Sequence, residues 1–233
     1  MGLGKRLDDG RLLRAMAEQL KAPILQIARQ LEFEGQQNES LAELSEQAEV
    51  ALNLLDSYLL STELHLAKEP LELEPVAISS MLYDTAHNLS NIAGQYNCQV
   101  ELQLSGKYEP VLAHKKSLGA ALTTLGYSFI EAQNIENLAD KTVITLAAHR
   151  TRYGIIAGIY GEQEGLSKDI YRRAKKLYGR AHQSLSISPS TGAGVFLADA
   201  LLASMSSHLH VSHHKNLSGL AATLLSSSQM SLV

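Results

Sequence analysis

The sequence lacks the features that mark several common classes of protein. Cys98 is the only cysteine among 233 residues, so an intrachain disulfide or a thiolate metal cluster within one chain is excluded. We expect Cys98 to be a small buried apolar residue instead. The formal net charge is -4. Such a mildly acidic chain has no excess of positive charge with which to bind nucleic acid in general.

No apolar run in the sequence is long enough to cross a membrane. Runs such as 198–203 are far shorter than the roughly 20 residues that span a bilayer. No signal peptide precedes the first expected helix. With 45% hydrophobic and 19% charged residues, the composition is that of a folded soluble protein, and we expect a cytoplasmic location.

A long helical pattern lies near the start of the chain. Apolar residues recur at spacings of three and four from Leu13 to Leu31, which predicts one helix with an apolar seam. Pro23 lies inside this seam, and its missing backbone donor predicts a local bend. The same spacing returns from Leu41 to Thr62. The two segments therefore predict a helical hairpin.

The polar residues 34–39 join these helices, and Asn38 suits the N-cap of the second one. Arms of about 30 residues would be about 45 Å long at 1.5 Å per residue, and two such helices enclose no core by themselves. We expect a second hairpin from a second chain, which gives a four-helix bundle in a homodimer.

The chain after the hairpin predicts a mixed α/β domain. The proline-flanked stretch 67–75 is the expected boundary between a hairpin of residues 1–68 and a domain of residues 69–233. The fold class is therefore α+β, with a helical hairpin followed by an α/β sandwich. Expected helices are 78–93, 118–132 and 191–205, and expected strands are 100–104 paired with one near Val111, 143–146, 155–159, 208–211 and 220–225.

Two polar stretches in this domain suggest binding chemistry. The basic segment 168–180 is expected to be an exposed helix or a mobile lid, and its charges could contact a phosphate. His208, His210, His213 and His214 are grouped near the end of the chain and could hold a metal ion. His208 and His210 share one face of a predicted strand whose other face is apolar, so we expect these histidines to face solvent.

Residues 17–27, AEQLKAPILQI, resemble the phosphoacceptor box of bacterial two-component sensor histidine kinases, which reads Ser-His-Glu-Leu-Arg-Thr-Pro-Leu. Leu20, Lys21, Pro23 and Ile24 match in type and spacing. The resemblance explains the proline, which bends the helix just after the phosphorylation site. Glu18 stands where the family has its histidine. A carboxylate cannot hold a transferable phosphoryl group as an imidazole nitrogen does.

Residues 111–132 are similar to the family segment that ends in Asn-Leu-Leu-x-Asn-Ala, whose last asparagine helps hold the magnesium ion of ATP. Thr124 and Ser128 stand at the two asparagine positions. In 161–165, GEQEG, Gly161 replaces the aspartate that recognises adenine in the Asp-x-Gly-x-Gly box, and Gly165 is its last glycine. The last box, STGAGVFLADALL, keeps Gly192 and Gly194, which could offer backbone amides to phosphates.

The resemblance implies a dimerisation and phosphotransfer hairpin followed by an ATP-binding domain of the GHKL type. The substitutions predict no catalytic residue and only a vestigial nucleotide pocket at Ser128, Gly165, Gly192 and Gly194. We expect no resident cofactor or metal, and weak binding of ATP and Mg²⁺ at most.

Three functions are compatible with these residues. The first is a catalytically impaired signalling protein that dimerises and docks a response regulator or an active histidine kinase through Glu18, Gln19, Lys21 and Ala22. The second is a divergent kinase or ATPase that uses Glu162 or Glu164 with Ser128. The third is a phosphotransfer-like adaptor, for which a histidine at position 18 is missing.

Overall fold

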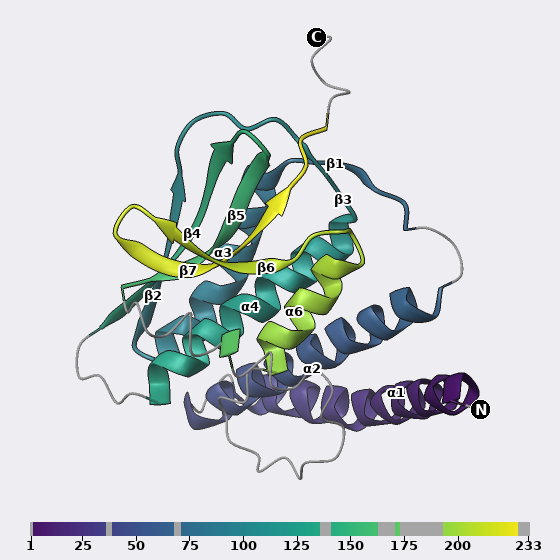
Figure 1. The fold of residues 1–233 in the computed structure, drawn as a ribbon. Coiled ribbons are helices and arrows are strands. Elements are labelled where there is room, and N and C mark those ends of the chain that lie inside the picture. Colours follow the sequence, from purple (N-terminus) through teal and green to yellow (C-terminus); the bar gives the residue numbers. More distant parts are fainter. Residues whose placement is uncertain are drawn as a thin grey trace. The chain divides into compact units, whose positions relative to one another are not determined.

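The computed structural model describes residues 2–35, 39–67, 71–135, 141–162, 171–172 and 193–227. The chain divides into two compact units, Met1–Glu69 and Pro70–Val233 (Figure 1). Within the described residues, no helix is both long enough and apolar enough to span a bilayer.

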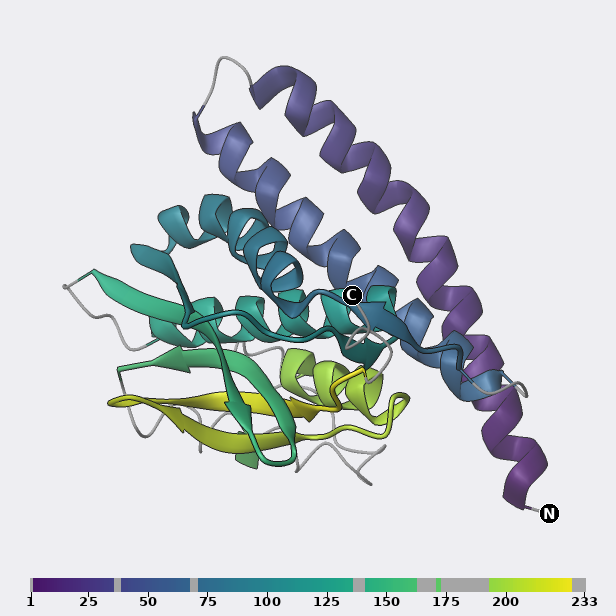
Figure 2. The ribbon, with the colours of Figure 1, turned by 90° about the horizontal axis from the view of Figure 1, so that it is seen from above.

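The first unit is the predicted helical hairpin, formed by α1 (Gly2–Gly35) and α2 (Glu39–Leu66). The two helices lie side by side, with Pro23 inside α1 (Figure 2). Small side chains fill the contact between them: Ala17 and Ala28 of α1 and Ser45 and Ser57 of α2 are buried. Small residues at these positions let the two backbones approach closely.

The helices of the second unit bury the faces that their sequence predicts. They are α3 (Ile78–Gln95), α4 (Lys115–Ile135) and α6 (Ala193–Ala203). Apolar residues at spacings of three and four become the inward face because one side of an amphipathic helix packs on the core. The apolar residues at these spacings in α3 and α4 are all buried: Ile78, Met81, Leu82, Ala86, Leu89, Ile92, Ala93, Leu118, Ala121, Leu122, Leu125 and Ile130.

A five-stranded sheet forms the other layer. Its strands are β2 (Cys98–Leu104), β4 (Thr142–Thr151), β5 (Gly154–Gly161), β6 (Leu209–His214) and β7 (Leu217–Leu224). They are ordered β2-β4-β5-β7-β6, with β2 parallel to β4 and all other neighbours antiparallel. The three helices cover one face of this sheet (Figure 2). The second unit is thus the expected α/β sandwich.

The expected pairing of residues 100–104 with the strand near Val111 is wrong. β3 (Val111–Ala113) pairs with β1 (Glu74–Val76) in a separate two-stranded sheet, and β2 pairs with β4. The segment between β2 and β3 is bound to β4 instead, because the Tyr108 hydroxyl donates to the carbonyl oxygen of Ala148 at 2.5 Å. On its other side, β3 contacts the residues that follow β7, since the Leu112 amide donates to the carbonyl oxygen of Leu225 at 2.8 Å.

The strands expected at 143–146 and 155–159, and at 208–211 and 220–225, are longer in the structure, so the turns between them are short. The basic residues 149–151 belong to β4, so only Arg152 and Tyr153 connect it to β5. Likewise β6 and β7 are joined by a two-residue turn at Lys215 and Asn216, and Lys215 has a φ of 53°. Strand pairing continues through the polar ends of both hairpins because their backbone groups find partners there.

Candidate functional site

On the hairpin, Glu18 is an exposed member of an ion pair. Its Oε1 lies 2.9 Å from Nε of Arg14, one helical turn earlier on α1, and the exposed fractions of the two side chains are 54% and 38%. A carboxylate in this setting can attract a cation on another protein. It provides no nitrogen that could carry a phosphoryl group.

The other residues of the expected docking surface differ in how available they are. Gln19 and Ala22 are exposed on α1. Lys21 is partly buried, and its ammonium group pairs with the carboxylate of Asp56 on α2. Lys21 therefore ties the two helices of the hairpin together, whereas Glu18, Gln19 and Ala22 present their side chains outward.

The hairpin also exposes large apolar side chains. Five of them have exposed fractions between 46% and 53%: Leu13, Met16, Leu20, Ile27 and Leu44. Leu13, Leu20 and Ile27 are seven residues apart, so they form one stripe along α1. A stripe of this length on an isolated hairpin is typical of a surface that packs on another helix.

In the second unit, the structure brings two of the expected nucleotide-pocket residues together. Ser128 lies on α4, and Gly194 lies in the first turn of α6. A Cβ atom on Gly194 would lie only 2.2 Å from Ser128 Oγ and 3.2 Å from the carbonyl oxygen of Thr124. The two helices thus touch at the position where the resemblance places magnesium and phosphates, and a glycine is what allows this approach.

The polar groups at this contact do not fit a magnesium nucleotide well. The Ser128 hydroxyl donates to the Thr124 carbonyl oxygen of its own helix at 3.1 Å, so it is engaged within α4. Gly161 ends β5 and has no side chain to receive the adenine amino group. Glu162, next to it, is exposed. Gly165, Gly192, Glu164 and the basic segment 168–180, apart from Tyr171 and Arg172, lie outside the described residues.

One titratable residue near this contact was not predicted from the sequence. Glu131 follows Ser128 by one turn of α4, between the buried residues Ile130 and Ala132. Burial raises its pKa from 4.5 to about 7. The pKa of Tyr96, at the end of α3, is raised by burial and then by the charge of Glu131. A carboxylate inside an apolar helical segment was the signal in the sequence.

His114 has a structural role at the start of α4. The Ser117 amide donates to His114 Nδ1 at 3.3 Å, and the Ser117 hydroxyl lies 2.7 Å from the same nitrogen. The imidazole therefore caps one of the amides that an α-helix leaves unpaired at its first turn.

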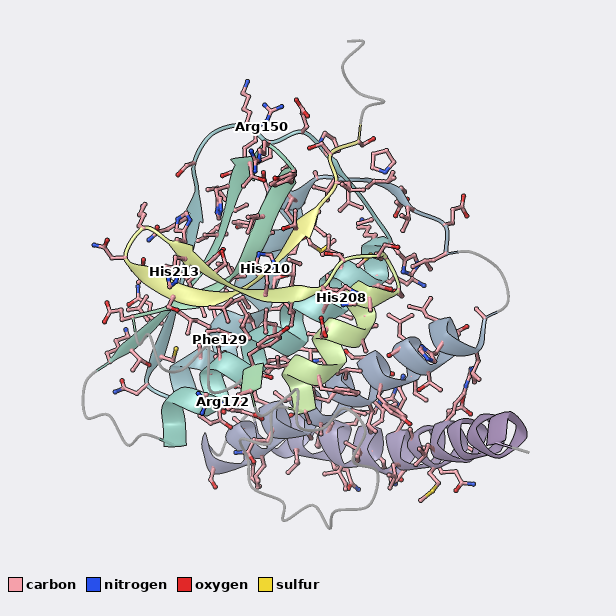
Figure 3. All side chains as sticks on the ribbon, viewed as in Figure 1. Phe129, Arg150, Arg172, His208, His210 and His213 are labelled. Atoms are coloured by element: carbon pink, nitrogen blue, oxygen red, sulfur yellow. The ribbon has the colours of Figure 1, made fainter. Side chains whose placement is uncertain are left out.

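The four clustered histidines differ in exposure. His208 and His213 are exposed, and His210 is partly buried (Figure 3). His208 Nδ1 lies 3.5 Å from Asp199 on α6. His214 is only 7% exposed, so the expectation that all four face solvent is wrong for this residue. Its ring packs near those of His149 on β4 and Tyr160 on β5, contacts that the alternation of residues along one strand does not reveal.

A metal site is not formed by these histidines. Across the part of the chain that the structure describes, no three His, Cys, Asp or Glu side chains are placed to hold a metal ion together. Cys98 is buried as expected, and burial raises the pKa of its thiol. A protonated, buried thiol is a poor nucleophile and metal ligand.

Comparison with known proteins gives similarity in fold only. No protein-family model and no curated protein matches the chain. The full-length structure of ShkA, solved in complex with AMPPNP, is similar with a TM-score of 0.58 and 19% sequence identity over 93% of this chain and 46% of ShkA. The histidine kinase AdeS of Acinetobacter baumannii is similar with a TM-score of 0.54 and 15% identity over 89% of this chain and 96% of AdeS. The chain thus spans about half the length of ShkA.

Proposed function

We propose that this chain, which has the fold of a sensor histidine kinase core with a GHKL-type domain, is a catalytically impaired signalling protein. In this proposal it acts in the cytoplasm as a homodimer and docks a response regulator or an active histidine kinase. The observation that carries the proposal is Glu18. Glu18 is exposed and ion-paired, and it stands where the motif resemblance places the phosphoacceptor histidine.

The contact between α4 and α6 supports the loss of nucleotide affinity. With Gly161 in place of the adenine-reading aspartate, one hydrogen bond worth about 1 to 3 kcal/mol is missing. The Ser128 side chain is shorter than that of asparagine, and its hydroxyl already donates to the Thr124 carbonyl oxygen. Its contact with a magnesium ion would therefore be weaker by a similar amount. Together these losses reduce affinity by roughly two to four orders of magnitude.

The exposed apolar stripe on α1 supports the homodimer. Leu13, Leu20 and Ile27 each leave about half of the side chain in contact with water in the single chain. Burying such residues against a second hairpin stabilises the pair by about 1 to 2 kcal/mol for each leucine or isoleucine, since half of each side chain is already buried. A four-helix bundle formed from two hairpins would cover this stripe.

The docking surface is the exposed part of α1 next to this stripe, at Glu18, Gln19 and Ala22. A partner that carries a basic or amide-rich patch would complement it, with Arg14 as the neighbouring cation. Purified receiver domains of response regulators, tested by biolayer interferometry, should include one that binds. Ala22→Arg should weaken that binding at least about tenfold, since a long charged side chain at the centre of a docked surface must be desolvated.

Glu49→Lys, on an exposed position of α2, is the matched control and should leave the affinity unchanged. Absence of binding to every receiver domain and to every histidine kinase tested would contradict the docking role.

ATP binding separates this proposal from the alternative of a divergent kinase or ATPase that uses Glu162 or Glu164 with Ser128. ATP at about 1 mM, with or without Mg²⁺, should not shift the melting temperature, because a millimolar binder at this concentration stabilises by less than about 0.5 kcal/mol. A clear shift that Ser128→Ala abolishes would favour the enzyme.

The phosphotransfer-like adaptor would require a histidine that accepts phosphate at another position, and label transferred from a phosphorylated partner would detect it.

A further inference from the structure

The face of the five-stranded sheet that points away from the helices has a small core of its own. Ala147, Tyr160 and Ala221 are fully buried there and pack with Ile156 and Leu217. Small residues lie side by side on three neighbouring strands in this core, because Ala147 pairs with Gly158 and Gly158 pairs with Ala221. We call this surface the outer face.

The turn between β6 and β7 reaches across the outer face. In the order of strands, β2 and β6 are at opposite edges of the sheet. Lys215, in the turn, nevertheless donates from Nζ to Oε1 of Gln103 on β2 at 2.9 Å. Figure 1 shows this turn on the side of β2. The sheet is therefore curled, and residues 213–217, the hairpin tip, close over its outer face.

Beneath the hairpin tip, three rings from three different strands meet. The ring of His214 on β6 lies 5.8 Å from that of His149 on β4 and 5.4 Å from that of Tyr160 on β5, between ring centroids. Two buried ring nitrogens, His149 Nδ1 and His214 Nε2, have no hydrogen-bond partner in the structure. Neutral imidazoles tolerate this arrangement better than charged ones, because burying a charge without a partner costs far more than burying a neutral polar group.

The charges around the two imidazoles are mostly positive. His210 and Lys215 act electrostatically on the pair, His210 on His149 and Lys215 on His214. Tyr160 faces His214 from β5, and its hydroxyl donates to Ser212 at 3.5 Å. Among the outer-face positions of the described strands, Glu101 on β2, which pairs with Thr145, is the only carboxylate.

We propose that the hairpin tip is a pH-sensitive strap, closed over the outer face while His149 and His214 are neutral and released from β2 when they are protonated. Two imidazolium rings at this separation would repel each other and Lys215. Release would break the Lys215 to Gln103 hydrogen bond and give water access to Tyr160 and the small residues under it.

The direction of the pH effect follows from the environment of both rings. Burial, and next the charge of His210, lower the pKa of His149. Burial lowers the pKa of His214 first, and His149 and Lys215 lower it further. Because the closed state binds protons less readily than the open state, the strap is fully stable above the ordinary histidine pKa of about 6.5 and loses stability as the pH falls below it.

Hydrogen exchange and histidine NMR on the full chain test the strap. Between about pH 8 and pH 5.5, the protection factors of amides in residues 213–217 should fall about tenfold for each unit by which the two pKa values are lowered, while those of α4 stay constant. In His149→Gln/His214→Gln, which has no charge to gain, the protection should change less than about twofold. His213→Gln, at an exposed position of the same hairpin, should behave like the unmodified protein.

Titration of the His149 and His214 ring protons in the unmodified protein should give pKa values below the ordinary histidine value of about 6.5. This measurement decides the matter even if the double variant does not fold. Ordinary pKa values for both rings, or an equal loss of protection in the unmodified protein and the folded double variant, would overturn the proposal.

Discussion

Single side chains decide what chemistry each unit can perform. In the proposed function, Glu18 replaces the phosphoacceptor histidine, and Gly161 and Ser128 replace the groups that would read adenine and bind magnesium. These losses concern separate units of the chain, so repairing one leaves the other. Glu131 adds a carboxylate that none of the matched motifs requires, in a place where burial raises its pKa to about 7.

Replacing Glu18 with histidine should not restore autophosphorylation. Glu18→His would supply an exposed imidazole on α1, but the contact between α4 and α6 would still lack the ligands for the nucleotide. Incubation with γ-labelled ATP and Mg²⁺ should leave this variant unlabelled. Labelling of Glu18→His alone would mean that the nucleotide pocket is intact and that position 18 is the only defect.

Replacing Glu131 with glutamine should stabilise the protein at high pH. The pKa of Glu131 is raised in the folded state, so the folded state binds the proton more tightly and loses stability as the pH rises from about 4.5 through about 7. Allowing for its partial exposure, Glu131→Gln should raise the free energy of unfolding by on the order of 1 to 2 kcal/mol at about pH 8.

At about pH 5, where the carboxyl group is protonated in the folded protein, urea denaturation should give the variant and the unmodified protein nearly equal stabilities. A variant that is less stable at the higher pH would show that the Glu131 carboxylate is stabilised by a partner.

At the scale of the helices and strands, capping and pairing determine the architecture. α4 begins at a histidine cap, and α4 and α6 meet through a glycine. The short strands β1 and β3 pair with each other instead of extending the main sheet. These features set the positions of Ser128 and Gly194.

The start of α4 predicts a stabilising substitution. His114→Asp should raise the free energy of unfolding by about 0.5 to 1 kcal/mol at neutral pH, because a carboxylate accepts from the Ser117 amide and interacts favourably with the helix dipole. His114→Ala, which cannot cap, should lower it by about 1 kcal/mol. Urea denaturation of the three proteins measures both changes, and equal stabilities of the two variants would show that the cap contributes nothing.

The success of the sequence-based predictions depended on the length of each element. The helices α3 and α4 were predicted correctly because several turns of helix repeat the same apolar spacing. β1 and β3 have three residues each, too few to show a period, so their pairing was missed. The burial of His214 was missed because it depends on the curl of the sheet, a property of all five strands together.

The candidate site could be predicted only in part. Ser128 and Gly194 were identified from motifs and do lie together. Glu131 has a signal in the sequence, a carboxylate inside an apolar helical segment, but its burial depends on residues far along the chain. The cap at His114 could not be assigned because the direction of a side chain is not given by the sequence. The predicted docking role of Lys21 likewise could not take account of its ion pair with Asp56 on the neighbouring helix.

At the scale of the whole molecule, the hairpin should determine the oligomeric state. The protein should have twice the chain mass of 25.3 kDa in light scattering at micromolar concentration. Leu20→Glu with Ile27→Glu should give a monomer that keeps its helical circular dichroism, because both side chains are already half exposed in the single chain. Replacing Leu20 and Leu55 together with charged residues should also disturb the contact between α1 and α2, since Leu55 is partly buried.

Glu49→Lys is the control for the added charges and should leave the protein dimeric. A mass of 25.3 kDa for the unmodified protein would contradict the dimer.

In the proposed function this chain has no kinase activity, and phosphoryl transfer to the protein tests this most directly. The unmodified chain would be incubated with γ-labelled ATP and Mg²⁺, and the label followed after treatment with acid and with alkali. We expect no label on the protein, because Glu18 offers no nitrogen and the nucleotide pocket lacks its ligands. Label that is stable in alkali and lost in acid, as expected of a phosphohistidine, would contradict the claim.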